Sequence, residues 1–341
     1  MGLEYRFSHK CCGMECHAVT AESKAPISFC HKTAAGGNSD GFACQHGCMV
    51  ITTLDPAIQS YAEHSGVHMN RHHSLVTTIQ ECFARALEEG DIIFHYQPVV
   101  DAVTGACLSS ELLMRWKDGA GNLIAPGLYI SAVEEDHELM KRTGAYTIEK
   151  ALSTYASWQQ RDAAPSQISV NSSPVEVADP AYANTVLDAL ERHGVNPTHL
   201  QIELTEGRKL LNVAQSQASL MKLAVAGINI ALDDFGEGYS SYTRLIKLPF
   251  HTIKLDRAAG QEYLASRNGM KLLARLIHYA SQHNKDIIVE GIESPDQVDT
   301  LVRAGVSKIQ GFVFSRPLPE RDFLQYVRDH PHLNPPTRTV A

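Results

Sequence analysis

Short apolar runs of strand-like length recur between residues 91 and 314, and most of the stretches between them have helical spacing of apolar residues. The strand-like runs are DIIFHYQPVV (91–100), GACLSSELLMRW (105–116), SQISVNSS (166–173), HLQIELTE (199–206), INIALDDFG (228–236), HTIKLD (251–256), KDIIVEGIE (285–293) and SKIQGFVF (307–314). Eight strands interleaved with helices predict an α/β fold, a (β/α)8 barrel of the TIM type.

The start of this barrel departs from the regular pattern. Helical spacing appears at 135–161, 268–285 and 294–305, but the first two strand-like runs are joined only by the short turn VDAVTGA. A short turn forces antiparallel pairing of the strands that it joins. The pattern therefore predicts a modified barrel with an antiparallel first strand.

Cysteine and histidine divide the chain into unequal parts. Six of the eight cysteines precede residue 50, and eight of the seventeen histidines precede residue 74, where a helix-like stretch, 74–91, begins. We therefore predict a small Cys/His-rich N-terminal segment over 1–73, a barrel over 74–330 and a C-terminal tail over 331–341. A barrel of that length is normal for its class.

Charge and hydropathy exclude several kinds of partner and location. The formal net charge of −8 argues against a nucleic-acid polymer as a partner, because such surfaces are usually basic. No apolar run approaches the roughly 18–20 residues that span a bilayer. The N-terminus, MGLEYRFSHKCCGMEC, lacks the apolar region of a secretory signal. We predict a cytoplasmic protein without a membrane span.

Polar residues stand where the apolar runs stop. In chain order they are Glu111, Asn171, Glu203, Asp233, Asp234, Lys254, Glu290 and Gln310, with Glu293 one helical turn after Glu290. The carboxyl ends of parallel barrel strands open on one face, where such enzymes place their chemistry. Carboxylates in that number cannot share a small pocket unless cations neutralise them.

The ligand types indicate which cations these are. All candidate ligands are oxygen donors, which select Mg²⁺ or Mn²⁺ over zinc or copper. The number of carboxylates indicates two ions, a device for cleaving phosphate esters. In the stretch IALDDFGEGYSS (230–241), Asp233 can bridge both ions and Asp234 can hold the second.

From about residue 78 to 330 the chain resembles the EAL domain family, the phosphodiesterases of the second messenger cyclic di-GMP. The motifs that carry the resemblance, in the family's order, are HYQPVV, SELLMRW, VNSS, IELTE, LDDFGEGYSS, LPFHTIKLD, VEGIES and IQGFVFSRPLP. Two positions depart from the family's pattern. Leu112 replaces the usual alanine, and Glu237 stands where threonine is frequent.

The resemblance implies an enzyme that hydrolyses cyclic di-GMP to linear pGpG with a metal-activated water, and a homodimer. One metal would be held by Glu111, Asn171, Glu203 and Asp233, and the other by Asp233, Asp234 and Glu290. The resemblance also implies that Lys254 orients the water and stabilises charge on the phosphate, and that Gln310 hydrogen-bonds within the same water network. Gln97 and Arg115 would contact the substrate. Glu206 would fix the loop 236–244, and Glu293 would support the side of the second metal.

Each of these residues also has a structural interpretation. The adjacent aspartates could form a capped turn, Glu203 and Glu206 a surface pair, and Lys254 a surface side chain with its charge in water. The functional alternative is a catalytically silent EAL domain that acts as a cyclic di-GMP receptor or a protein-binding module. Loss of catalysis usually removes a ligand or the lysine, and here every expected one is present.

The N-terminal segment contains two C-x3-C spacings, Cys12 with Cys16 and Cys44 with Cys48. In a cytoplasmic protein, clustered cysteine and histidine suggest a metal site, holding zinc or an iron–sulfur cluster. A set of redox-sensing thiols or a plain tail with reactive thiols are the alternatives. We expect activity of the dimer to depend on the metal or redox state of this segment.

Overall fold

The structure, a computed structural model, describes residues 55–65, 74–205, 210–235 and 248–331. Two compact units divide the chain: the first takes in residues 1–93 and 115–139, and the second 94–114 and 140–341. The domain boundary near residue 74 stays a prediction.

The first unit is built around buried aromatic rings. Its elements are α1 (Pro56–Ser65), α2 (Leu75–Glu89), β3 (Leu123–Ile124), η1 (Pro126–Leu128) and α3 (Ile130–Glu135). Phe83 of α2 lies edge-on to Trp116, with ring centroids 5.6 Å apart, and stacks on Tyr129 at 5.2 Å. Tyr61 brings α1 onto Trp116 at 5.2 Å. Such ring pairs stabilise a core beyond the area that they bury.

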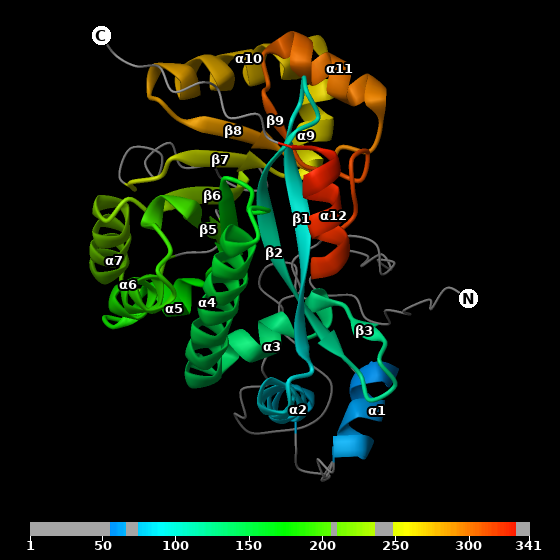
Figure 1. Cartoon of the computed structure of the whole chain (residues 1–341), viewed down its shortest axis with the longest axis vertical. Helices are drawn as coiled ribbons and strands as arrows, with labels where there is room; N and C mark the ends of the chain where they lie inside the picture. Colours follow the sequence, from blue (N-terminus) through cyan, green and yellow to red (C-terminus); the bar gives the residue numbers. More distant parts are fainter. Residues whose placement is uncertain (1–54, 66–73, 206–209, 236–247, 332–341) are drawn as a thin grey trace, which may run out of the picture. The chain divides into compact units, whose positions relative to one another are not determined.

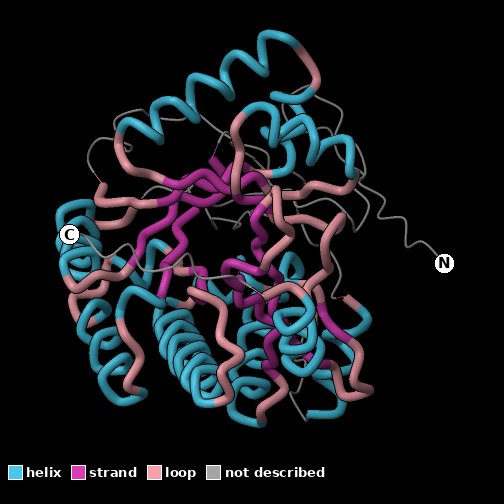
Figure 2. Tube along the Cα trace, turned by 45° about the horizontal axis from the view of Figure 1, so that its top comes forward, coloured by secondary structure: helices cyan, strands magenta, loops and turns pink. Residues whose placement is uncertain are grey.

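The second unit contains the barrel (Figures 1 and 2). Three elements continue into it from the first unit: β1 (Ile92–Asp101), β2 (Cys107–Lys117) and α4 (His137–Gln160). The others are β4 (Gln167–Asn171), α5 (Pro174–Val177), α6 (Tyr182–His193), η2 (Pro197–His199), β5 (Leu200–Thr205), α7 (Val213–Val225), β6 (Asn229–Phe235), β7 (Thr252–Leu255), α9 (Arg257–Leu264), α10 (Arg267–Gln282), β8 (Asp286–Val289), α11 (Pro295–Ala304), β9 (Lys308–Ile309) and α12 (Glu320–Asp329).

The strands close into a ring. Their order is β1-β9-β8-β7-β6-β5-β4-β2, and a pairing between β1 and β2 completes the circle, while β3 adds to β2 outside it. From β2 through β9 the ring pairings are parallel, whereas β1 runs antiparallel to β9, with Val100 opposite Ile309. The prediction of a modified (β/α)8 barrel with an antiparallel first strand is confirmed.

Each of the eight strand-like runs contains one strand of the ring. Helices lie around the outside of the ring (Figure 2). In such a barrel, the apolar side chains of the strands are buried against these helices or in the packed interior, and the strand residues are accordingly buried. Ile168, Ile202, Ile230 and Ile253, on four consecutive strands of the ring, are all fully buried. Among the described residues, no helix is long and apolar enough to cross a bilayer.

Candidate active site

The polar residues at the strand ends gather around one lysine. Lys254, on β7, has only 1% of its surface exposed. Its Nζ lies 2.5 Å from Glu203 Oε2, 2.7 Å from Glu290 Oε1, 3.2 Å from Asp233 Oδ1 and 3.5 Å from Glu111 Oε2. Glu203 lies on β5, Asp233 on β6 and Glu111 on β2, and Glu290 directly follows β8. With Lys254, the structure thus brings together five predicted site residues from five different strands or strand ends.

The electrostatics of this cluster depend on burial and on an imbalance of charge. Burial disfavours the charged form of Lys254, but the Asp233, Glu111, Glu203 and Glu290 carboxylates outweigh burial and raise the pKa of its ammonium well above the ordinary value. Burial also raises the pKa of Glu203, and the Lys254 charge offsets only part of that rise. One ammonium for four carboxylates leaves a strong demand for further positive charge.

Side-chain amides connect the first, second and last strands of the ring to the cluster. Gln310 Nε2 donates to Glu111 Oε2 at 2.6 Å and approaches Gln97 Oε1 at 3.2 Å, while Gln97 Nε2 donates to the Ser315 carbonyl at 3.3 Å. Asn171 Nδ2, at the end of β4, donates to Glu111 Oε1 at 3.1 Å. Glu111 therefore accepts one hydrogen bond on each oxygen, and its carboxylate plane is fixed from two sides.

The adjacent aspartates stand at an irregularity of β6. The pairing of β6 with β7 shifts register between Leu232 and Phe235, and Asp234 has a φ of 55°, in the left-handed region. In a regular strand, successive side chains point to opposite faces, and a bulge interrupts that alternation. Left-handed backbone is uncommon outside glycine but tolerated by aspartate. The local irregularity thus coincides with Asp233 and Asp234, the pair expected to serve both metals.

A polar residue inside β5 belongs to the site although the sequence pattern did not mark it. Gln201 is 2% exposed, donates from Nε2 to Glu203 Oε1 at 3.0 Å, and accepts at Oε1 from the Thr252 hydroxyl at 3.1 Å. It lies two residues before Glu203, and Thr252 lies two residues before Lys254. Residues two apart share a strand face, so this alternation was the signal that could have identified Gln201.

Other predicted site residues are not among those that contact Lys254. Glu293 pairs elsewhere, Arg115 belongs to the first unit, and several others lie outside the residues that the structure describes. The side chain of Glu293 is 44% exposed and pairs with Arg257 Nη1 at 2.9 Å. Arg115 is on β2 in the first unit. Glu206, the loop that follows Phe235, and Cys12, Cys16, Cys44 and Cys48 lie outside the described residues.

The donor set of the cluster fits hard divalent cations. It consists of carboxylate and amide oxygens, the ligands that Mg²⁺ and Mn²⁺ prefer. Asp233 Oδ1 is buried and, apart from its ion pair with Lys254, accepts no hydrogen bond from the described part of the chain. Within that part, no group of three or more His, Cys, Asp or Glu side chains is arranged as a metal site. The described carboxylates instead pair with the Lys254 ammonium.

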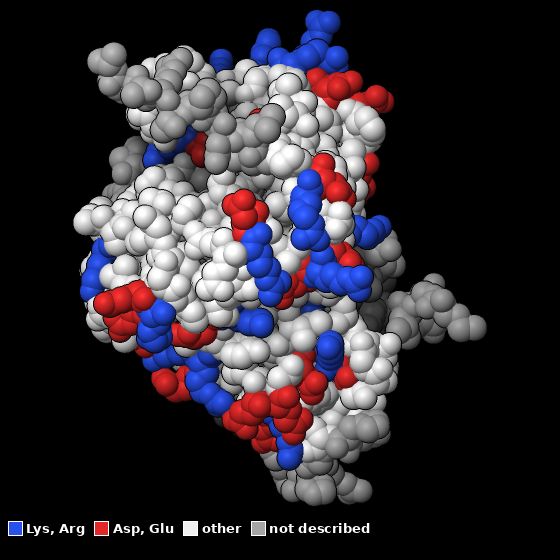
Figure 3. Space-filling view, in the orientation of Figure 1, with Lys and Arg blue, Asp and Glu red and all other residues white. Residues whose placement is uncertain are grey.

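The charges on the surface are mixed in sign. On the face that Figure 3 shows, Lys and Arg side chains lie beside Asp and Glu side chains. Partly exposed ion pairs in the described part of the chain include Lys308 Nζ with Asp286 Oδ2, 2.7 Å apart, and Arg257 with Glu293. This mixture on the face shown agrees with a composition in which acidic residues only moderately outnumber basic ones.

Known proteins resemble this chain over the barrel. The family model for the EAL domain matches residues 80–317. The bifunctional diguanylate cyclase/cyclic di-GMP phosphodiesterase MucR of Pseudomonas aeruginosa is 32% identical over 243 residues, which cover 71% of this chain and 35% of MucR. The cyclic di-GMP phosphodiesterase RocR of the same organism is 30% identical over 242 residues, 71% of this chain and 61% of RocR. The chain thus spans less than two thirds of either relative.

A solved structure shares both fold and sequence with the chain. The PaMucR phosphodiesterase in complex with c-di-GMP superposes with a TM-score of 0.66 at 31% identity, covering 72% of this chain and 99% of that one. The matched part contains the strand ends that form the carboxylate cluster, and the family model covers well over half of the residues. On this evidence, the chain belongs to the EAL domain family.

Proposed function

We propose that this protein hydrolyses cyclic di-GMP to linear pGpG. The observation that carries the proposal is the convergence of four carboxylates on the buried Lys254 ammonium at the strand ends of an EAL domain. The names of MucR and RocR describe them as cyclic di-GMP phosphodiesterases, and the PaMucR structure contains c-di-GMP. Phosphate ester hydrolysis needs a concentrated positive charge, which this cluster is suited to collect.

The cofactors in this proposal are two divalent ions, Mg²⁺ or Mn²⁺. One would be held by Glu111, Asn171, Glu203 and Asp233, and the other by Asp233, Asp234 and Glu290. Bound there, the ions would supply a water of lowered pKa and neutralise charge on the phosphate.

The remaining residues position the reactants. Lys254 would stabilise negative charge on the phosphate with its ammonium, whose pKa the surrounding carboxylates raise against the effect of burial. Gln310 donates hydrogen bonds to Glu111 and Gln97 and restricts both side chains, and it would also hydrogen-bond within the water network of the site. Gln97 and Arg115 would contact the substrate, Arg115 with directed donors to a phosphate oxygen. Glu206 would order the loop after Phe235, and Glu293 would support the second-metal side.

The second candidate function is a receptor that binds cyclic di-GMP without hydrolysing it. The observation that favours it is that Lys254 pairs with every carboxylate of the cluster. The lysine neutralises part of the negative charge of the carboxylates, so the cluster has some charge compensation without metal. The complete ligand set favours catalysis over this reading.

One experiment separates the two candidates. The full chain is incubated with cyclic di-GMP and Mg²⁺ or Mn²⁺, and the products are separated by chromatography. We expect pGpG, no product in excess chelator, and loss of product in Glu203→Gln. The matched control is Asp286→Asn, which removes an exposed carboxylate at the opposite end of β8 and should hydrolyse normally. Tight binding with no product in either metal would refute the hydrolase and support the receptor.

Regulation and assembly are further parts of the proposal. We expect a cytoplasmic homodimer in which the N-terminal segment, through zinc, an iron–sulfur cluster or thiol oxidation, alters activity. The test compares the full chain with a truncation that starts near residue 74, before and after metal removal and oxidation. Equal specific activity and equal oligomeric state in all forms would refute this regulation.

A further inference from the structure

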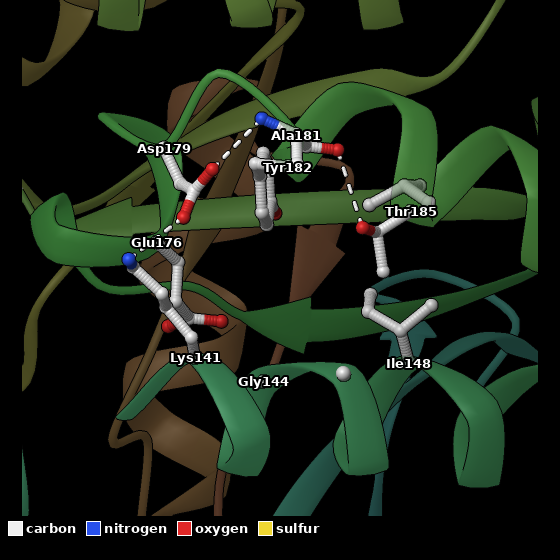
Figure 4. A pocket seen from close by; sticks show the side chains of 10 residues that line it. Lys141, Gly144, Ile148, Glu176, Asp179, Ala181, Tyr182 and Thr185 are labelled. Atoms are coloured by element: carbon white, nitrogen blue, oxygen red, sulfur yellow. Dashed lines mark hydrogen bonds and ion pairs between the residues drawn. The ribbon is translucent and has the colours of Figure 1, made fainter. Parts of the chain in front are cut away.

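A cavity lies beside the strand that carries Asn171, between helices α4, α5 and α6 (Figure 4). Its volume is about 80 Å³. Gly144 and Ile148 face it from α4, Glu176 from α5, and Tyr182 and Thr185 from α6. At its rim, Lys141 Nζ pairs with Asp179 Oδ2 at 2.9 Å. None of these residues belongs to the carboxylate cluster.

Glu176 is the buried ionisable group of this cavity. It is 3% exposed, and its Oε2 accepts from the Ser173 backbone N–H at 2.7 Å. In return, the Glu176 N–H donates to Ser173 Oγ at 3.3 Å, so the two residues form a capping box at the start of α5. The second carboxylate oxygen, Oε1, accepts no hydrogen bond from the described residues and turns toward α4 (Figure 4).

Helix α4 leaves space for this carboxylate at a glycine. A Cβ placed on Gly144 would lie 1.8 Å from Glu176 Oε1 and 2.6 Å from its Cδ. No side-chain carbon can approach that closely, so an alanine at position 144 must displace the carboxylate. The close approach means that Glu176 has a defined position in the fold, set by both α4 and α5.

The capping box is continuous with the candidate active site. Ser173 is two residues after Asn171, whose Nδ2 donates to Glu111 Oε1 at 3.1 Å. Between them, the Ser172 N–H donates to the Glu203 carbonyl at 2.9 Å, and its hydroxyl lies 2.6 Å from the Tyr182 hydroxyl. The last residue of β4 and the two residues that follow it are thus held on one side by the cluster and on the other by Glu176 and Tyr182.

We propose that Glu176 is a positioning residue: through the Ser173 N–H it fixes the turn after β4 and thereby aims Asn171 at Glu111 and at the metal that both would bind. The inference rests on the proposed function for its consequence in turnover. Outer partners that orient metal ligands typically change metal affinity by about 10–100-fold when they are removed. A helix cap alone stabilises the fold without a specific effect on metal affinity.

The experiment measures Mn²⁺ binding to the full chain by the EPR signal of free Mn²⁺. The portion of binding that disappears in Asp233→Asn defines the barrel site. Hydrogen exchange in peptides that span residues 171–178 reports on the Ser173 hydrogen bond. The variants are Glu176→Ala, which removes the acceptor, Glu176→Gln, which keeps an acceptor oxygen, and Gly144→Ala, which displaces the carboxylate.

A matched control changes the same cavity without touching the capping box. Thr185→Val alters the wall on α6, where the Thr185 hydroxyl donates only to the Ala181 carbonyl of its own helix. The double variant Gly144→Ala with Glu176→Ala tests whether the glycine acts through the carboxylate, because the added methyl group then has room.

We expect Glu176→Ala and Gly144→Ala to weaken Mn²⁺ binding at the barrel site about tenfold and to speed exchange in 171–178. Glu176→Gln and Thr185→Val should bind as the wild type, and the double variant should equal Glu176→Ala. Wild-type affinity in Glu176→Ala, or an equal loss in Glu176→Gln, would overturn the proposal. If Glu176→Ala does not fold, Gly144→Ala and Glu176→Gln decide the question.

These readouts require no turnover. A wild-type chain that binds Mn²⁺ at the Asp233-dependent site but leaves cyclic di-GMP intact refutes the proposed function alone. Normal hydrolysis together with unchanged metal affinity in Glu176→Ala and Gly144→Ala refutes the positioning role alone.

Discussion

Lys254 is the counter-charge that four carboxylates share in the structure, and its replacement by methionine tests the energetic weight of this arrangement. Methionine keeps most of the side-chain length and removes the charge. At an effective dielectric constant of about 20, each contact of 2.5–3.5 Å between Lys254 and a carboxylate represents a gross attraction of about 5 kcal/mol. The free-energy cost of removing the five charged groups from water offsets most of the total attraction from these four contacts.

The net effect is better taken from the removal of one partner of a buried ion pair, which costs about 3–5 kcal/mol. We expect Lys254→Met to lower the free energy of unfolding by that amount in chelator, because four carboxylates then share a site without a counter-charge. Added Mg²⁺ should narrow the difference from wild type, because the cluster without its ammonium has more uncompensated negative charge and should bind the cation more tightly than the wild type does. An ion at a hundred times its Kd stabilises the folded state by about 2.7 kcal/mol.

Urea denaturation of both proteins, with and without Mg²⁺, measures this difference. The control is Lys308→Met: Lys308 pairs with Asp286 at 2.7 Å, the same distance as Lys254 to Glu290, but its side chain is 32% exposed. An exposed pair contributes about 1 kcal/mol or less. If Lys254→Met costs no more than Lys308→Met, or if Mg²⁺ leaves the difference unchanged, Lys254 is not the internal counter-ion of the cluster.

Four further outcomes are expected. Lys254→Ala should bind cyclic di-GMP nearly normally while kcat falls by orders of magnitude, as measured by steady-state turnover with a binding isotherm. Ca²⁺ should inhibit the Mg²⁺-dependent activity in a competition assay, because its longer and looser coordination misplaces the water; equal activity in Ca²⁺ would contradict this. Gln201→Leu should weaken Mn²⁺ binding about tenfold, because Glu203 Oε1 loses its donor; unchanged binding would contradict a role in the site. Burial raises the pKa of Glu176 from 4.5 to about 7, so the folded state holds that proton more tightly than the unfolded state. Relative to Glu176→Gln, the wild type should therefore lose about 3 kcal/mol of unfolding free energy as pH rises from about 4.5 to about 7, and parallel pH profiles of the two proteins would refute this.

The barrel could be predicted because its signals are local and repeated. A parallel strand that is buried on both faces must be apolar along most of its length, so each of the eight strands can be recognised as an apolar run in the sequence. Helix α1 lies in the N-terminal segment, which is characterised by its cysteine and histidine content and not by apolar spacing, and β3 has only two residues, too few for any periodicity. The division into two units depends on contacts between segments distant in the chain, such as Tyr61 with Trp116, which no local pattern encodes.

The carboxylate cluster could be predicted for the same topological reason, because parallel strands end on one face. What the pattern could not provide was the second layer. Gln201 lies inside an otherwise apolar strand, and nothing in the local pattern shows that its side chain donates a hydrogen bond to Glu203. Nor does spacing distinguish Glu290, which is 5% exposed, from Glu293, whose side chain pairs with Arg257 at the surface. The backbone irregularity at Asp234 is equally invisible, although the adjacent aspartates mark its place.

The closure of the ring has a consequence for folding during synthesis on the ribosome. The antiparallel β1 meets β9, so Val100 pairs with Ile309 and Tyr96 exchanges backbone hydrogen bonds with Leu318. Of the two ring partners of β1, β2 follows at once, but β9 is the last strand to be synthesised, more than 200 residues later. At about 5–20 residues per second, the open edge of β1 waits for at least 10 seconds or so before its neighbour emerges. An exposed strand edge invites pairing with other chains, so we expect nascent chains of this protein to be most prone to such pairing during that interval.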